Sequence, residues 1–86
     1  MPRLSSFYGI DIYIYAHDHN PPHFHAMTGG REATIQIRDG QVLHGRLSRP
    51  DERRVATWHR LHLAELMTAW KKAAQGADPG SIEPLA

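Results

Sequence analysis

Four histidines lie within one short segment of this chain, HDHNPPHFH, which covers residues 17–25. The chain contains seven histidines in all, so more than half of its imidazoles surround two adjacent prolines. Imidazole is a common metal ligand and the side chain best suited to exchanging protons near neutral pH. The segment is therefore either a place where imidazoles converge on a metal ion or a reacting phosphate, or a stiff loop in which they are polar filler.

Two of these histidines are expected to project side by side. Residues 23–28 have the pattern of a short strand, and side chains two positions apart on a strand point to the same face. His23 and His25 would therefore offer two imidazoles to one metal ion, with Phe24 buried on the other face. His17 points less predictably along the turn, and we assign it no ligand role.

Further ligands could come from the turn that precedes this strand. His19 lies on a stiff proline turn and could close on the same point as a third imidazole. Asp18 could supply an oxygen ligand, or accept a hydrogen bond that fixes an imidazole tautomer. Three imidazoles with an open coordination position would form a catalytic type of zinc or other transition-metal site. The predicted metal ligands are therefore Asp18, His19, His23 and His25.

The competing interpretation of the turn is structural. It would then be a rigid corner whose histidines bond to backbone carbonyls and stack on tyrosines, because this spacing matches no named catalytic signature. His62 also has two interpretations: a buried imidazole bonded to a strand, or a further member of the histidine cluster. His59, one helical turn earlier, is expected at the surface.

The composition limits the classes of function. The chain has 86 residues, 41% of them hydrophobic, which corresponds to one compact domain. It has no cysteine, so neither a disulfide nor a thiolate metal site can form. Ten basic and nine acidic side chains give a net charge of +1, far from the excess that indicates nucleic-acid binding by electrostatics alone. Neither a secretory signal nor a bilayer-spanning segment is evident, so we expect a cytoplasmic protein without membrane contact.

The elements that must position these residues are predicted to be four strands followed by one long helix. Apolar alternation indicates the strands, and glycine turns separate the later ones. A serine–aspartate capping pair marks the start of the helix, and a glycine marks its end. The predicted strands are residues 7–15, 23–28, 32–38 and 41–47, and the predicted helix covers residues 48–75. The register of the last strand stays open, because two alternating sets compete for its inward face.

The predicted architecture is α+β, with a four-stranded, mostly antiparallel sheet and one long C-terminal helix packed across it. Residues 1–76 would form a single domain and residues 77–86 an extended tail, which Ile82 and Leu85 could pin to the body. The second face of the sheet would be solvated or covered by a partner chain, and a homodimer is one such arrangement.

Four segments carry a resemblance to a known family: RLSSFYGIDIYIYAHDHNPPHFHA, EATIQIRDGQVLHGRL, WHRLHLAELMTAW and IEPL. Together they resemble the bacterial domain-of-unknown-function 4160 family, and DHNPPHFH looks like its hallmark. The family's motif positions lie both in the histidine turn and in the predicted helix, so the resemblance suggests one site built from the two segments. The motif positions of the family fall on Asp18, His19, Pro21, Pro22, His23, Phe24, His25, Trp58, His62, Glu65 and Trp70.

This resemblance implies a function. Genes of that family commonly lie beside a small partner of the domain-of-unknown-function 2442 family, and such pairs have been proposed as type II toxin–antitoxin modules. We therefore expect a toxin-like protein with a small antitoxin-like partner. Its reaction would be cleavage of RNA or another phosphoester, by imidazole acid–base catalysis or with a metal that activates water. The candidate catalytic residues are His19, His23, His25 and His62.

The alternative function is a non-catalytic regulatory module in which the histidine turn is structural. Such a module would bind a partner protein or DNA through the tyrosine face of the sheet and through arginines around the start of the helix. These arginines are Arg46, Arg49, Arg53 and Arg54.

Overall fold

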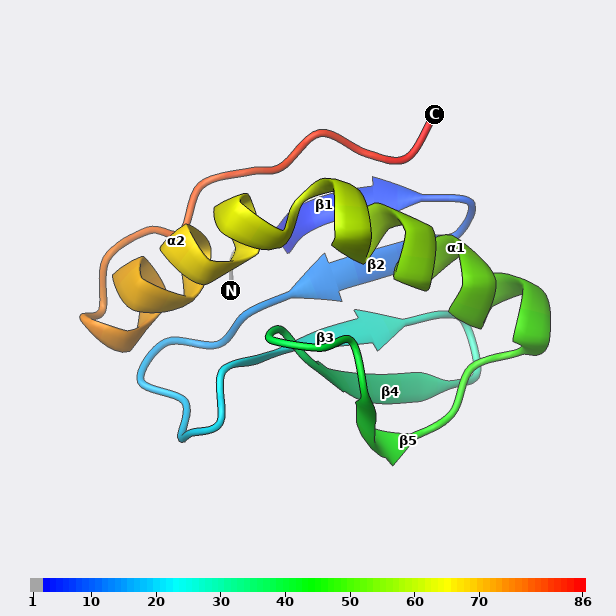
Figure 1. Cartoon of the computed structure of the whole chain (residues 1–86), viewed down its shortest axis with the longest axis horizontal. Helices are drawn as coiled ribbons and strands as arrows, with labels where there is room; N and C mark the ends of the chain where they lie inside the picture. Colours follow the sequence, from blue (N-terminus) through cyan, green and yellow to red (C-terminus); the bar gives the residue numbers. More distant parts are fainter. Residues whose placement is uncertain (1–2) are drawn as a thin grey trace.

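The computed structural model describes residues 3–86 as one five-stranded sheet and two consecutive helices (Figure 1). All neighbouring strands pair antiparallel, in the order β1-β2-β3-β4-β5. The α+β class is confirmed, whereas the predicted numbers of four strands and one helix are wrong. The elements are β1 (Arg3–Phe7), β2 (Ile10–Tyr13), β3 (His23–Met27), β4 (Glu32–Gln36), β5 (Val42–Gly45), α1 (Arg49–Leu61) and α2 (Leu63–Ala74).

The predicted first strand, residues 7–15, is divided by a hairpin turn. Phe7 pairs with Ile10, and the two residues between them, Tyr8 and Gly9, have φ angles of 53° and 77°. A two-residue turn with two positive φ angles matches the twist of the strands that it joins. The apolar alternation continues through this turn, so the pattern by itself joins the end of β1 to β2 as one predicted strand.

His62 separates the two helices that the periodicity predicts as one. Its φ of −126° is not helical, and its N–H is shared between the carbonyl oxygens of Trp58 at 3.1 Å and His59 at 3.2 Å. The apolar stripe is the same on both sides of the interruption, with Trp58 and Leu66 both fully buried. Hydrophobic periodicity therefore gives no sign of the break.

The β4–β5 hairpin contains a bulge. Ile35 pairs with Val42, but its neighbour Thr34 pairs with His44, so Leu43 is an extra residue on β5. A bulge of this kind reverses the alternation of side chains along the strand. Neither of the two registers considered for residues 41–47 therefore holds throughout.

The helices cover one face of the sheet, and the C-terminal tail runs back along its β1 side (Figure 1). The Ile82 N–H donates to the carbonyl oxygen of Leu4 at 2.8 Å, and the Trp58 Nε1–H donates to that of Glu83 at 2.8 Å. Ile82 is buried in the core. His59 is buried too, so the prediction that it lies at the surface is wrong.

The opposite face of the sheet carries polar and aromatic side chains that are only partly buried, among them Tyr13, His25 and Thr34. Neighbouring residues on a strand point to opposite faces, so Ala33 and Ile35 enter the core while Thr34 does not. Within residues 3–86, neither helix has the length and apolar character needed to cross a membrane.

Candidate metal centre

A loop of residues 14–22 joins β2 to β3 and carries the first half of the site. Backbone hydrogen bonds hold this loop at two points. The His17 N–H donates to the carbonyl oxygen of Ala73, at the end of α2, at 3.0 Å. The Ile37 N–H donates to the carbonyl oxygen of Pro22 at 3.0 Å. The loop therefore has a fixed position beside the end of α2, as Figure 1 shows.

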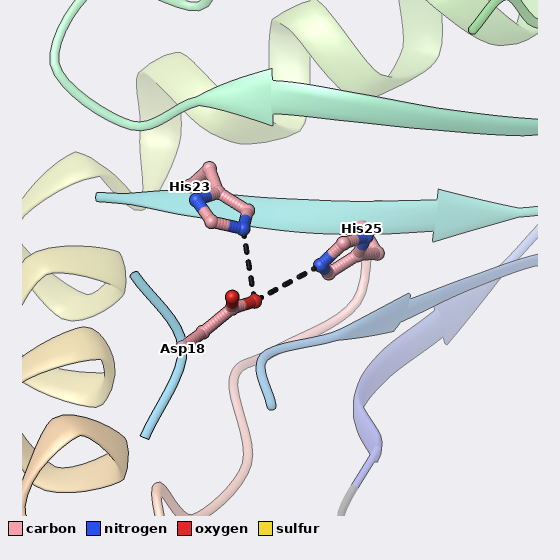
Figure 2. A group of neighbouring side chains, drawn as sticks. All are labelled: Asp18, His23 and His25. Carbon is pink, nitrogen blue, oxygen red and sulfur yellow. Dashed lines mark hydrogen bonds and ion pairs between the residues drawn. The ribbon is translucent and has the colours of Figure 1, made fainter. Parts of the chain in front are cut away.

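Asp18 of this loop points toward two histidines of β3 (Figure 2). Its Oδ2 lies 2.9 Å from Nε2 of His23 and 3.4 Å from Nε2 of His25. One ligand atom of each residue lies within 4.8 Å of the other two. The exposed fractions of the side chains are only 15% for Asp18, 5% for His23 and 13% for His25. His23 and His25 converge as predicted, and Phe24 between them is fully buried.

The contacts of His23 call for either a second ring proton or a metal ion next to Asp18. Nδ1 of His23 lies 2.7 Å from the carbonyl oxygen of Pro21. Because a carbonyl oxygen only accepts hydrogen bonds, Nδ1 carries the ring proton. In the neutral ring, Nε2 then directs a lone pair at Asp18 Oδ2, which is also an acceptor, 2.9 Å away. Two acceptors at this distance repel each other unless a proton or a metal ion lies between them.

The spacing of these atoms suits a small divalent metal ion. Tetrahedral zinc, with ligand bonds of about 2.0–2.2 Å, separates neighbouring ligand atoms by about 3.3–3.6 Å. Of the two distances from Asp18 Oδ2, 3.4 Å lies in this range and 2.9 Å is shorter. The bond from Nδ1 of His23 to a backbone carbonyl is also the outer contact that metal-bound histidines usually make. Two imidazoles and one carboxylate would hold such an ion and would leave coordination positions open for water or substrate.

The rings of both histidines are held by their neighbours. The ring of His23 packs beside Trp70 of α2, with centroids 5.2 Å apart, and that of Tyr15 beside His25, with centroids 4.3 Å apart. Nδ1 of His25 lies 3.4 Å from the hydroxyl of Thr34. Packing and polar contacts thus fix the direction in which both Nε2 atoms point.

The surroundings of Asp18 favour its ionised form. Burial by itself would raise the pKa of this carboxyl group. The hydrogen bonds from the His19 N–H and from His25, together with the charge and hydrogen bond of His23, outweigh burial and hold the pKa below its ordinary value. Asp18 is therefore a carboxylate, the form that binds metal ions, over the physiological pH range.

The other two predicted histidines lie outside this group. The side chain of His19 is 88% exposed, and its Nδ1 lies 3.1 Å from the other oxygen of Asp18, Oδ1. His62 lies between the helices, where its Nδ1 is 2.6 Å from Glu65 Oε1 and its ring packs near Trp58. The resemblance had grouped His62 and Glu65 with the histidine turn; in the structure they form a pair of their own.

A pocket of about 390 Å³ adjoins the Asp18, His23 and His25 side chains. Its lining includes residues that sequence reasoning did not assign to the site. His44 and Leu43 enter it from β5 because of the bulge, which no local pattern reveals. The complete lining is Tyr15, Asp18, His19, Pro21, His23, His25, Thr34, Leu43 and His44.

The arginines around the start of α1 are partly neutralised. Arg46 Nε lies 3.2 Å from a carboxylate oxygen of Glu52, and an Arg54 nitrogen lies 2.9 Å from one of Asp51. The Arg54 guanidinium also lies over the ring of Tyr8, 4.7 Å from its centroid. These contacts reduce the positive charge on which DNA binding at this surface would depend.

A five-stranded antiparallel sheet, two helices over one face, and one aspartate and two histidines as possible ligands on the other define a small α+β protein with a candidate metal centre. The sequence profile described as "Domain of unknown function (DUF4160)" matches residues 9–71, which include the whole histidine turn. The chain belongs to this family. No match was found among curated proteins or among solved structures.

Proposed function

We propose that this protein binds a divalent transition metal ion, such as zinc, through Asp18, His23 and His25, and uses it to hydrolyse a phosphoester bond of RNA. The observation that carries the proposal is the geometry of His23. Its Nδ1 donates to a backbone carbonyl, so in the neutral ring Nε2 directs a lone pair at the Asp18 carboxylate, and only a second ring proton or a metal ion can lie between the two atoms. A divalent cation at this point would resolve the repulsion and complete the coordination.

Each part of the pocket has a task in such a reaction. The metal ion would lower the pKa of a water molecule and polarise the phosphoryl group. Burial raises the pKa of Tyr15, with Glu32, Tyr13 and Asp18 adding to the effect, so its hydroxyl remains a hydrogen-bond donor. The exposed imidazoles of His19 and His44 at the pocket are suited to proton transfer to the leaving group.

The biological setting that we propose rests on the family resemblance. The protein would act as the toxin of a cytoplasmic type II toxin–antitoxin module, and a small cognate protein would suppress its activity. Binding of that protein over the open sheet face would close the metal pocket.

Metal analysis tests the proposal. The purified protein is stripped with a chelator, dialysed against zinc and analysed by mass spectrometry and titration calorimetry. We expect about one zinc ion per chain, and we expect His23→Ala, His25→Ala and Asp18→Asn each to abolish stoichiometric binding, because each removes a ligand. His17→Asn is the matched control: it removes an imidazole from the same loop, and asparagine tolerates the φ of 58° at this position.

Cleavage of single-stranded RNA by the zinc-loaded protein, lost with the chelator and with His25→Ala, would support the catalytic part. Cleavage that persists in the chelator would mean that a proton, rather than a metal ion, lies between His23 and Asp18. Absence of both stoichiometric metal and cleavage would refute the proposal and favour the non-catalytic binding module.

A further inference from the structure

A second pocket lies between α1 and the β4–β5 hairpin, on the face of the sheet opposite the candidate metal centre. Its volume is about 170 Å³. Buried apolar side chains, including Ala33, Ile35 and Val55, form its walls, and exposed residues, including Ala56 and Arg60, also line it. The pocket therefore combines an apolar interior with access from solvent.

The imidazole of His59 lines this pocket, and one of its two ring nitrogens has no partner among the described residues. His59 is only 6% exposed, and its Nε2 lies 2.5 Å from the carbonyl oxygen of Ile37. Since that oxygen only accepts, Nε2 carries the proton, and Nδ1 of the neutral ring is a free acceptor. Within residues 3–86, Nδ1 makes no hydrogen bond. A Cβ at Gly40 would lie 3.2 Å from Nδ1, so the absence of a side chain there leaves this edge of the ring uncovered.

We propose that this pocket binds a small molecule made of one six-membered aromatic ring with one hydrogen-bond donor, such as a phenol, whose donor bonds to Nδ1 of His59. The size supports one ring, because an apolar cavity of about 150 Å³ is known to hold benzene. The carboxylates of Asp39 and Glu52 also line the pocket but accept hydrogen bonds from the backbone, so Nδ1 of His59, unpaired in the described part of the chain, supports one donor on that ring. This site is independent of the metal centre.

The test is a titration of the full chain, with and without zinc, followed by two-dimensional amide NMR. Phenol is compared with fluorobenzene, which has nearly the same size and no donor. We expect saturable phenol-induced shifts confined to α1 and the β4–β5 hairpin. We expect fluorobenzene to bind about tenfold more weakly, because it leaves Nδ1 without a partner.

Ala56→Leu places extra carbon atoms at the pocket and should weaken phenol binding at least tenfold. Ala74→Leu is the matched control on α2, exposed and not part of this pocket, and should leave the affinity unchanged. Shifts that do not saturate, equal affinities for the two probes, or equal effects of the two leucine variants would overturn the proposal. Loss of phenol binding on zinc addition would also contradict the independence of the two sites.

Discussion

Replacement of Gly45 by alanine is expected to destabilise the β4–β5 hairpin and, with it, one wall of the candidate metal pocket. Gly45 has a φ of +72°, and a Cβ added there would lie 2.1 Å from the carbonyl oxygen of Glu32 and 3.3 Å from the Cα of Ala33. The obstacle is the backbone of the neighbouring strand, which cannot rotate aside as a side chain can. To restore ordinary contact, the two strands must separate by more than about 1 Å.

Two effects determine the size of the loss. A left-handed backbone conformation costs alanine about 1–2 kcal/mol. Separation of the strands also weakens the hydrogen bonds between them, each of which contributes about 0.5–1.5 kcal/mol. We therefore expect the free energy of unfolding to fall by about 2–4 kcal/mol. In a domain of this size, the melting temperature should fall by at least about 8 °C.

Urea denaturation followed by tryptophan fluorescence measures this loss, because Trp58 and Trp70 are both buried. Gly30→Ala is the control: an added Cβ at Gly30 meets nothing within 4 Å, and this glycine has no positive φ. A decrease of less than about 0.5 kcal/mol for Gly45→Ala, the range of ordinary surface substitutions, would refute the reasoning. Equal losses for the two variants would refute it as well.

Two further predictions concern the metal centre. Because the pKa of Asp18 is below its ordinary value of 3.8, its carboxylate stabilises the folded state above that pH, and this contribution is lost as the pH falls through the folded-state pKa. In the metal-free protein, Asp18→Asn should therefore be less stable than the wild type at about pH 6, and urea denaturation should show the difference shrinking in acid; a difference independent of pH would contradict this. Thr34→Val keeps the side-chain shape but removes the hydroxyl 3.4 Å from Nδ1 of His25, so calorimetry should show roughly tenfold weaker zinc binding. Unchanged affinity would mean that this hydroxyl does not orient the ring.

Several features of the protein follow from the sequence because they depend on local geometry. His23 and His25 share a face of β3 since side chains alternate along any strand. The start of α1 is equally local: the Ser48 side chain accepts a hydrogen bond from the Asp51 N–H, as a capping pair predicts. The α+β class follows from the order of these patterns.

The features that the sequence did not reveal have two causes. The Tyr8–Gly9 turn is local, but apolar alternation continues on both sides of it and hides it. The burial of His59 depends on its hydrogen bond to the carbonyl oxygen of Ile37, which lies 22 positions away in the sequence. The spacing of apolar residues in the helix does not indicate this contact.

In the candidate site, too, some features follow from local geometry and others from tertiary contacts. The sequence by itself determined that two imidazoles leave β3 in one direction, because the period of a strand is fixed by its backbone. Only the tertiary structure decided that Asp18 completes the group while His19 remains exposed, and that the bulge brings His44 to the pocket. The physical reason is that a loop takes its conformation from the elements that hold its backbone, here the end of α2 and the strand region at Ile37, and no periodic pattern encodes those contacts.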